Sequence, residues 1–261
     1  MPSQTCALDF AGLFFDACPA AMIGTALNTA GILVGGALGL ARRKPSTPAN
    51  ENVFRVILGA FTVFYGLRLA WLSINGTFLQ GLKQFIIAVL ALMLGRMTGR
   101  LLRLQRMSNR LGRQARERIN AANAPGTNRT SAGFQTCAEL FCAAPLGILG
   151  AVQDGLSGYY YPLAVKAVMD GLATRGFVLL FGWGAIISAV PVLAVQGSIS
   201  LACAQYLRPV LETHNLLDSV NAVGGFLVVS VALVILEIKK IELADYLPSL
   251  FFAPLITWLC R

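Results

Sequence analysis

The sequence is poor in charge and has almost no histidine. Only 13% of its 261 residues are charged, while 56% are hydrophobic. A typical soluble domain has about 25% charged residues, so this deficit indicates that lipid is the solvent. His214 is the single histidine, and the six cysteines include no CxxC pair. We therefore expect neither a metal site nor a bound cofactor.

Motifs of soluble enzymes are also missing. The glycines at 31–36 follow no strand and precede no Gly-Lys-Ser/Thr, which excludes a phosphate loop. With His214 expected outside the membrane, no Ser or Cys has a histidine partner for nucleophilic catalysis. Residues 1–19 contain no Lys or Arg, so we interpret them as a short external segment and not as a cleavable signal peptide.

Long apolar segments predict an all-α fold, a polytopic transmembrane helical bundle of seven or eight spans. Spans 1–3 fall within 20–105, a cytoplasmic basic amphipathic helix and flexible loop within 106–132, and the remaining spans within 133–261. The segment 159–174 is shorter than the ~20 residues that a crossing helix needs, so a re-entrant pair around 141–174 is the alternative. The expected spans are 20–41, 53–73, 78–98, 133–152, 159–174, 176–196, 216–236 and 246–260.

Basic residues gather on one side of this bundle. They follow the first span at 42–44, the third at 96–118, the fifth at Arg175 and the seventh at 239–240. All four positions lie in the cytoplasm if the N-terminus lies outside. The net charge of +9 is thus largely local, because 96–118 holds eight Arg and one Glu. This placement favours a lipid surface over nucleic acid as the partner.

Between 96 and 116, arginines recur every three or four residues and so form one stripe of a helix. Leu104, Met107 and Leu111 form a second, apolar stripe. We interpret this segment as a helix lying along the cytoplasmic face of the bilayer, with its arginines at anionic headgroups. The residues expected at headgroups are Arg42, Arg43, Lys44, Arg103, Arg106, Arg110, Arg113, Lys239 and Lys240.

Glycines at GxxxG spacing predict close helix packing, within one chain or in a homo-oligomer. Asn28 and Asn221 each stand three residues before such a glycine, in two spans that run in the same direction. This faint repeat suggests a pseudo-symmetric pair, with coincidence as the alternative. The glycines expected at helix contacts are Gly31, Gly35, Gly39, Gly224 and Gly225.

The stretch 139–171 is apolar but carries several ionisable groups, each of which costs about 2.5–3.5 kcal/mol at mid-membrane. Lys166 and Asp170 are four residues apart, so a helix would pair them. A pair that only fixes helix register is the alternative. Nearby Gly and Pro predict broken helices, as at transport sites. We expect a path for a small solute or ion lined by Asn28, Glu139, Gln153, Asp154, Lys166, Asp170 and Asn221.

Three functions remain open at this point. A transporter or channel using the polar path is favoured, because intramembrane ionisable groups usually serve function. A membrane-embedded enzyme would use Glu139 and Asp154. A regulatory or scaffold protein would act through the arginine stripe.

Three stretches of the chain resemble the YqgA-like bacterial inner-membrane proteins, whose domain has no known function. They are MIGTALNTAGILVGGALGL, LFCAAPLGILGAVQDGLSG with LAVKAVMDG, and NAVGGFLVVSVALVILEIKKIELADYLPSLFFAPL. The resemblance covers about 21–256 and implies a multi-pass inner-membrane protein. The chain differs in its N-terminal extension, 1–20, and in having Tyr159 where relatives often carry an acid. The motif residues carried over are Asn28, Asp154, Gly155, Lys166, Asp170, Asn221, Gly224, Gly225, Lys239 and Lys240.

Overall fold

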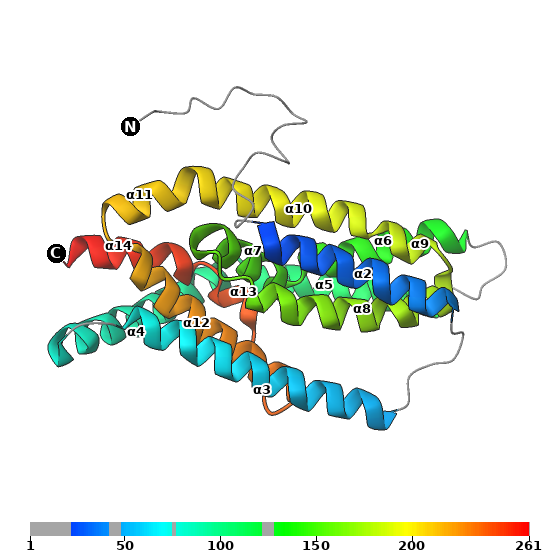
Figure 1. Cartoon of the computed structure of the whole chain (residues 1–261), viewed down its shortest axis with the longest axis horizontal. Helices are drawn as coiled ribbons and strands as arrows, with labels where there is room; N and C mark the ends of the chain where they lie inside the picture. The colour runs from blue at the N-terminus through cyan, green and yellow to red at the C-terminus, as the bar shows by residue number, and fades with distance from the viewer. Residues whose placement is uncertain (1–21, 42–47, 75–76, 122–127, 261) are drawn as a thin grey trace.

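Every secondary-structure element that the structure describes is a helix, which confirms the all-α expectation (Figure 1). The structure is a computed structural model that describes residues 22–41, 48–74, 77–121 and 128–260. The expected external segment 1–19 and the basic residues 42–44 lie outside these ranges. The helices are α2 (Ile23–Ala41), α3 (Pro48–Ser73), α4 (Phe78–Leu101), α5 (Leu104–Ala121), α6 (Arg129–Ala143), α7 (Pro145–Ser157), α8 (Tyr161–Phe181), α9 (Gly184–Ile187), α10 (Ala189–Ala202), the π-helix η2 (Cys203–Leu207), α11 (Arg208–Thr213), α12 (Leu217–Ile235), α13 (Leu243–Tyr246) and α14 (Ser249–Leu259).

Among the described residues, five helices are long and apolar enough to cross a membrane, or six if the bent pair α6–α7 forms one span. The expected seven or eight spans are therefore too many. The helix α8 has 21 residues but carries Lys166, Asp170 and Arg175. The apolar segment Leu243–Leu259 is short.

Helices α3 and α4 turn large apolar side chains outward. Trp71, Phe78 and Leu79 are 79%, 84% and 74% exposed. A soluble monomer rarely exposes such contiguous apolar surface, whereas lipid solvates it without cost. The outer faces of α3 and α4 thus support the assignment to a membrane.

Two helix boundaries differ from the expected spans. The helix α8 continues past Arg175 to Phe181, so the fifth segment is not too short to cross a bilayer. The sixth apolar segment begins at Gly184 and continues through η2 and α11 to Thr213. Residues 197–213 therefore extend the expected sixth span, which was placed at 176–196.

A sharp break separates α6 from α7, which meet at 56°. Pro145 occupies the first turn of α7 and lacks an N–H to continue the α6 ladder. Ala144, the residue before it, is extended with ψ 123°, as the proline ring favours. Gly158 ends α7 in the left-handed conformation with φ 66°. The expected discontinuity is thus present, but it lies inside the fourth apolar segment.

The short helix α7 connects two groups of helices. One group packs α2, α6, α8, α9 and α10 together, and the other packs α3, α4, α12 and α14 together. α7 contacts α8 and α10 in the first group and α12 in the second (Figure 1). Leu146 and Leu149 of α7 join the apolar core around Val223 and Leu227 of α12. α7 therefore presents its polar residues to both groups.

Candidate functional site

Polar side chains are buried where α2, α7, α8 and α10 meet, and we refer to them together as the buried polar cluster. All of them are 0–7% exposed. They come from α2, from α7, from α8 and from α10, which are brought together by contacts between distant parts of the chain. The members of the buried polar cluster are Thr25, Asn28, Asp154, Lys166, Asp170, Gln196 and Ser200.

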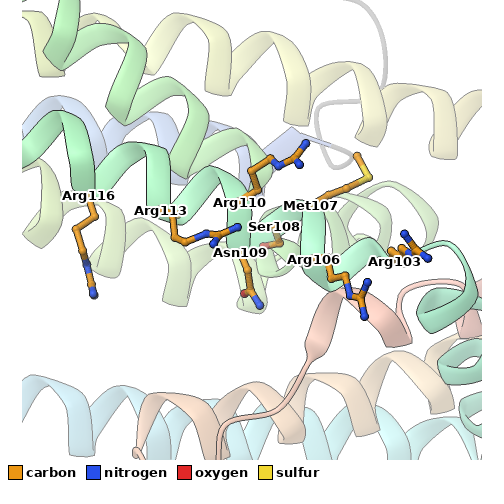
Figure 2. Close-up of a pocket in the computed structure, with 9 residues that line it drawn as sticks. Arg103, Arg106, Met107, Ser108, Asn109, Arg110, Arg113 and Arg116 are labelled. Atoms are coloured by element: carbon orange, nitrogen blue, oxygen red, sulfur yellow. The ribbon is translucent and has the colours of Figure 1, made fainter.

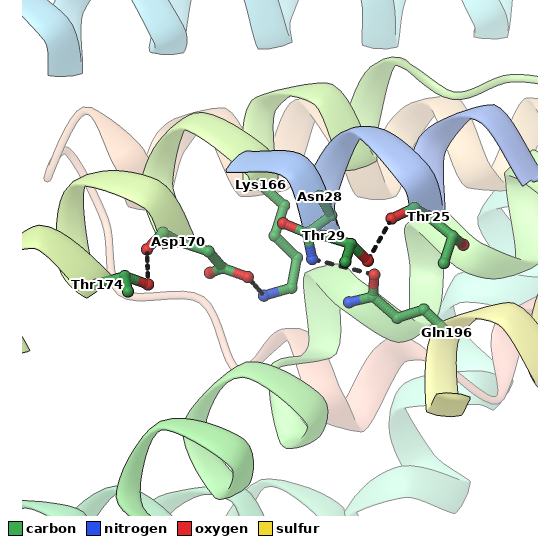
Figure 3. Close-up of polar contacts among 7 residues, drawn as sticks. All are labelled: Thr25, Asn28, Thr29, Lys166, Asp170, Thr174 and Gln196. Carbon is green, nitrogen blue, oxygen red and sulfur yellow. Dashed lines mark hydrogen bonds and ion pairs between the residues drawn. The ribbon is translucent and has the colours of Figure 1, made fainter. Parts of the chain in front are cut away.

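The ion pair expected on the fifth segment is present. Lys166 Nζ lies 2.5 Å from Asp170 Oδ2, one turn along α8 (Figure 3). The Lys166 ammonium also lies 5.6 Å from the centre of the Phe141 ring, which attracts cations. The pair is enclosed, since the two side chains are 3% and 10% exposed. It is therefore an enclosed contact between charges in the interior of the protein.

Amide groups from two other helices stand beside this pair. Asn28 Nδ2 donates to Gln196 Oε1 at 3.0 Å, which joins α2 to α10 (Figure 3). A Cβ added to Gly147 would lie 2.8 Å from Lys166 Cε and 2.9 Å from Gln196 Nε2. The backbone of α7 therefore lies directly against both side chains, because Gly147 has no side chain to hold it away.

Asp154 serves the beginning of another helix. Its Oδ2 accepts a hydrogen bond of 3.1 Å from the backbone N–H of Gly24, in the first turn of α2. The first N–H groups of a helix have no partner within the helix, and a carboxylate also stabilises the positive end of its dipole. Asp154 therefore caps α2 from a position 130 residues further along the chain.

The expected path residues Gln153 and Asn221 lie on the other side of α7, at its contact with α12. Asn221 Oδ1 accepts a hydrogen bond of 2.7 Å from the Ser157 hydroxyl. Gln153 is fully buried, and a Cβ on Gly224 would lie 1.9 Å from its Nε2. Gly224 thus makes room for the Gln153 amide. These residues form a second polar contact, separated from the buried polar cluster by the thickness of α7.

Several atoms in these two places have no hydrogen-bond partner within the described residues. They include Oδ1 of both Asn28 and Asp154, and Nε2 of Gln196. Both amide atoms of Gln153 are also unpaired. A buried polar atom without a partner costs about 1–3 kcal/mol, so such atoms are rare and usually meet water or a ligand. Five of the unpaired buried side-chain atoms among the described residues therefore lie on α2, α7 and α10.

Glu139 lies away from these residues. Its Oε1 forms an ion pair with Arg118 Nη1 of α5 at 2.9 Å, and both side chains are about one-third exposed. The sequence shows no local partner for Glu139, because Arg118 belongs to α5 and Glu139 to α6, on either side of 122–127. The structure thus connects Glu139 to the basic helix α5 instead of to the polar path.

The expected glycine contacts bring α2 and α8 together in parallel. A Cβ on Gly31 would lie 2.4 Å from the Ala167 carbonyl oxygen, and one on Gly35 would lie 2.0 Å from that of Gly171. Gly39 continues the series at Arg175. On α12, Gly225 packs against the backbone of α3. These glycines allow the backbone contacts that hold Asn28 beside Lys166 and Asp170.

The expected arginine stripe is divided between two helices, because Arg96 and Arg100 lie on α4, and the arginines from Arg106 onward lie on α5, where the helix is exposed. Arg103, with φ 57°, forms the corner between α4 and α5. An open cavity of about 920 Å³ is lined by Arg103 and residues of α5, and its arginine side chains extend away from the helix axis (Figure 2). Lys239 and Lys240 line a neighbouring cavity. These side chains are available to anions. The cavity around α5 is lined by Arg103, Arg106, Met107, Ser108, Asn109, Arg110, Gly112, Arg113 and Arg116.

A third cavity, of about 520 Å³, reaches the break between α6 and α7. Its walls are mostly apolar and include Pro145, Leu146 and Met169. Arg55 and Glu237, which form an ion pair of 2.7 Å, lie at its border. Leu146 directly precedes Gly147, which lies against Lys166, and Met169 directly precedes Asp170. The cavity therefore approaches the buried polar cluster from the end of the bundle that carries the basic residues.

Thr25, Gln196 and Ser200 were not among the residues expected at the site. Ser200 Oγ donates to the Ala151 carbonyl at 2.9 Å and lies 3.4 Å from Thr25 Oγ1. These residue types are common at helix surfaces, so their burial follows only from the packing of α10 against α2 and α7. The one sequence signal was their placement in apolar segments.

A comparison with protein families identifies the chain. The model described as "Protein of unknown function (DUF554)" matches residues 23–258. The chain belongs to the DUF554 family. The resemblance to YqgA is confirmed as well, because the chain is 28% identical to the uncharacterized protein YqgA of Escherichia coli over 89% of this chain and 94% of that protein.

A second relative is equally similar. The uncharacterized membrane protein YdfK of Bacillus subtilis is 28% identical over 90% of this chain and 95% of its own length. Together with the apolar helices, this similarity supports a membrane protein. No solved structure matches the chain.

Proposed function

We propose that this DUF554 protein transports a small solute or ion across a membrane and that the buried polar cluster binds it. The observation that carries the proposal is the set of unpaired polar atoms beside the enclosed Lys166–Asp170 pair. An ion pair within α8 that served only to fix the register of this helix would be surrounded by satisfied groups. Atoms without partners in a fully buried position are better explained by a bound species that completes their hydrogen bonds.

The break at Ala144–Pro145 supports the same function. Broken helices near the centre of a membrane expose backbone groups and helix ends to a bound species, which is a recurring feature of secondary transporters. The cavity of about 520 Å³ at this break gives a route from one end of the bundle. The enclosed cluster and this one-sided cavity correspond to an occluded state that opens next toward the basic end.

Orientation follows from the charges. The basic residues of α5 and the 239–240 loop would face the cytoplasm, with the N-terminus outside and the protein in a bacterial inner membrane. The parallel contact of α2 with α8 agrees, since both would then run from outside to inside. In a variant without its native cysteines, a membrane-impermeant maleimide should label Thr213→Cys, just before the outer end of α12, in intact cells, and should label Lys240→Cys only after the cells are opened.

A second candidate function is regulation or scaffolding through α5. The exposed arginines around the cavity of about 920 Å³ favour it, because they suit anionic headgroups. An enzyme that uses Glu139 and Asp154 together is favoured less, because Glu139 pairs with Arg118 while Asp154 caps α2, so these two carboxylates lie in different places. Transport and scaffolding require no cofactor. A homo-oligomer is compatible with transport, with scaffolding and with an enzyme.

Transport is tested with the full-length protein in liposomes. We expect uptake of at least one species from a panel of radioactive amino acids, sugars, sodium, rubidium and chloride. Lys166→Met and Gln196→Leu should abolish this uptake, whereas Glu139→Gln, which changes a surface pair, should retain it. Absence of uptake for the whole panel, or uptake that is unaffected by both cluster variants, would refute the proposal.

A further inference from the structure

The buried polar cluster contains one more negative charge than positive charge. Asp154 and Asp170 contribute −1 each and Lys166 contributes +1, so the sum is −1. Lys166 is bound to Asp170, and no Lys, Arg or His among the described residues pairs with Asp154. An isolated charge in a low-dielectric interior is costly unless an opposite charge or hydrogen bonds compensate for it.

The hydrogen bonds around Asp154 compensate for only one of its oxygens. Oδ2 accepts from the Gly24 N–H, and the Thr25 N–H also lies toward the carboxylate, while Oδ1 has no hydrogen-bond partner among the described residues although Asp154 is 0% exposed. Asp154 also lies in the last turn of α7, where the negative end of the helix dipole adds to its charge. Both effects favour a cation at Oδ1.

Neutral oxygen atoms belong to the same junction of α2, α7 and α10. Thr25 follows Gly24 directly, and its hydroxyl lies 3.4 Å from that of Ser200. The Ala151 carbonyl, which accepts from Ser200, is three residues before Asp154 on α7. Carboxylate, hydroxyl and carbonyl oxygens are the ligands that hard cations prefer, and the C-terminal ends of half-helices bind such ions in transporters.

We infer that Asp154 binds a monovalent metal cation, Na⁺ or K⁺, at the junction of α2, α7 and α10. A single charge is favoured because one cation balances the sum of −1. A divalent ion would need further carboxylates, and the described residues contain no group of three His, Cys, Asp or Glu side chains. The role of this cation as the ion that drives uptake rests on the proposed transport function. Its binding does not depend on that function.

Thermal unfolding of the purified full-length protein tests the site. At equal ionic strength, NaCl or KCl should raise the midpoint above that in choline chloride, by about 3–5 °C when the cation is tenfold above its dissociation constant. Asp154→Asn should remove this rise, because the amide can still accept from Gly24 but carries no charge. The control Asp218→Asn removes an exposed acid from α12 and should keep the rise.

A second variant covers the case in which Asp154→Asn fails to fold. Ser200→Ala keeps the charge and removes one oxygen, so the cation concentration at half-maximal stabilisation should increase several-fold. The wild-type protein is compared in NaCl, KCl, MgCl₂ and choline chloride. The inference is overturned if the unfolding midpoint is the same in all four salts, or if MgCl₂ alone raises it. If cations stabilise the protein but the liposomes show no uptake, only the transport proposal is refuted. If uptake occurs but does not depend on Na⁺ or K⁺, only the role of the bound cation in driving uptake is refuted.

Discussion

Replacing Lys166 by Met should destabilise the protein strongly. The change keeps most of the side-chain volume but leaves the Asp170 carboxylate, 7% exposed, without its cation. Breaking a buried pair in this way costs about 3–5 kcal/mol. For a chain of this size, each kcal/mol lowers the unfolding midpoint by about 2–4 °C, so we expect a loss of about 6–20 °C.

The double variant Lys166→Met with Asp170→Asn separates stability from function. It removes both charges and keeps a group that can bond to Asn28, so most of the lost stability should return. Uptake in liposomes should still be absent. If the ion pair were only structural, the double variant would recover uptake together with stability.

Another pair of the same spacing gives a matched control. Arg208 and Glu212 are also four residues apart and lie 2.7 Å from each other, but their side chains are 39% and 48% exposed. Arg208→Met should therefore lower the midpoint by little, since such exposed pairs contribute about 0.3–0.5 kcal/mol. Equal losses for Lys166→Met and Arg208→Met would show that burial does not set the cost and would refute the reasoning.

Three further predictions follow from local contacts. Gly35→Ala should destabilise the protein by about 1–3 kcal/mol or more, because the new Cβ would overlap the Gly171 carbonyl. Gly112→Ala should not destabilise it, because no atom lies within 4 Å of the new Cβ, and thermal unfolding compares the two variants. Gln153→Met should raise the unfolding midpoint but lower uptake, since it removes two unpaired buried atoms. Asp245→Ala should increase hydrogen exchange at the start of α5, because the Asp245 carboxylate accepts from the Gln105 N–H at 2.8 Å; unchanged exchange would contradict this.

Features that depend on local spacing could be predicted from the sequence. The four-residue interval between Lys166 and Asp170 predicts their pairing, and the glycines of the first span predict a close neighbour. The sequence could not identify that neighbour as α8, because a small-residue face fits any helix with a matching one. Gly171 and Ala167 supply the match only after the chain has folded.

The remaining site residues depend on contacts over long separations. Asn28 and Gln196 are 168 residues apart, and no pattern within either helix indicates that they meet. Arg118 and Glu139 similarly pair between two helices, so Glu139 could not be separated from the polar path by its position alone. The helix α8 was expected to stop at Arg175 because a charge usually marks the end of a span, yet it continues to Phe181.

The cap that Asp154 places on α2 has a consequence for biogenesis. While the chain emerges from the ribosome, the first span enters the bilayer with free N–H groups at its N-terminal end, long before the Asp154 carboxylate has been synthesised. Nascent chains that stop short of residue 154 should therefore hold this helix loosely. The first segment to be inserted would be among the last to reach its final position.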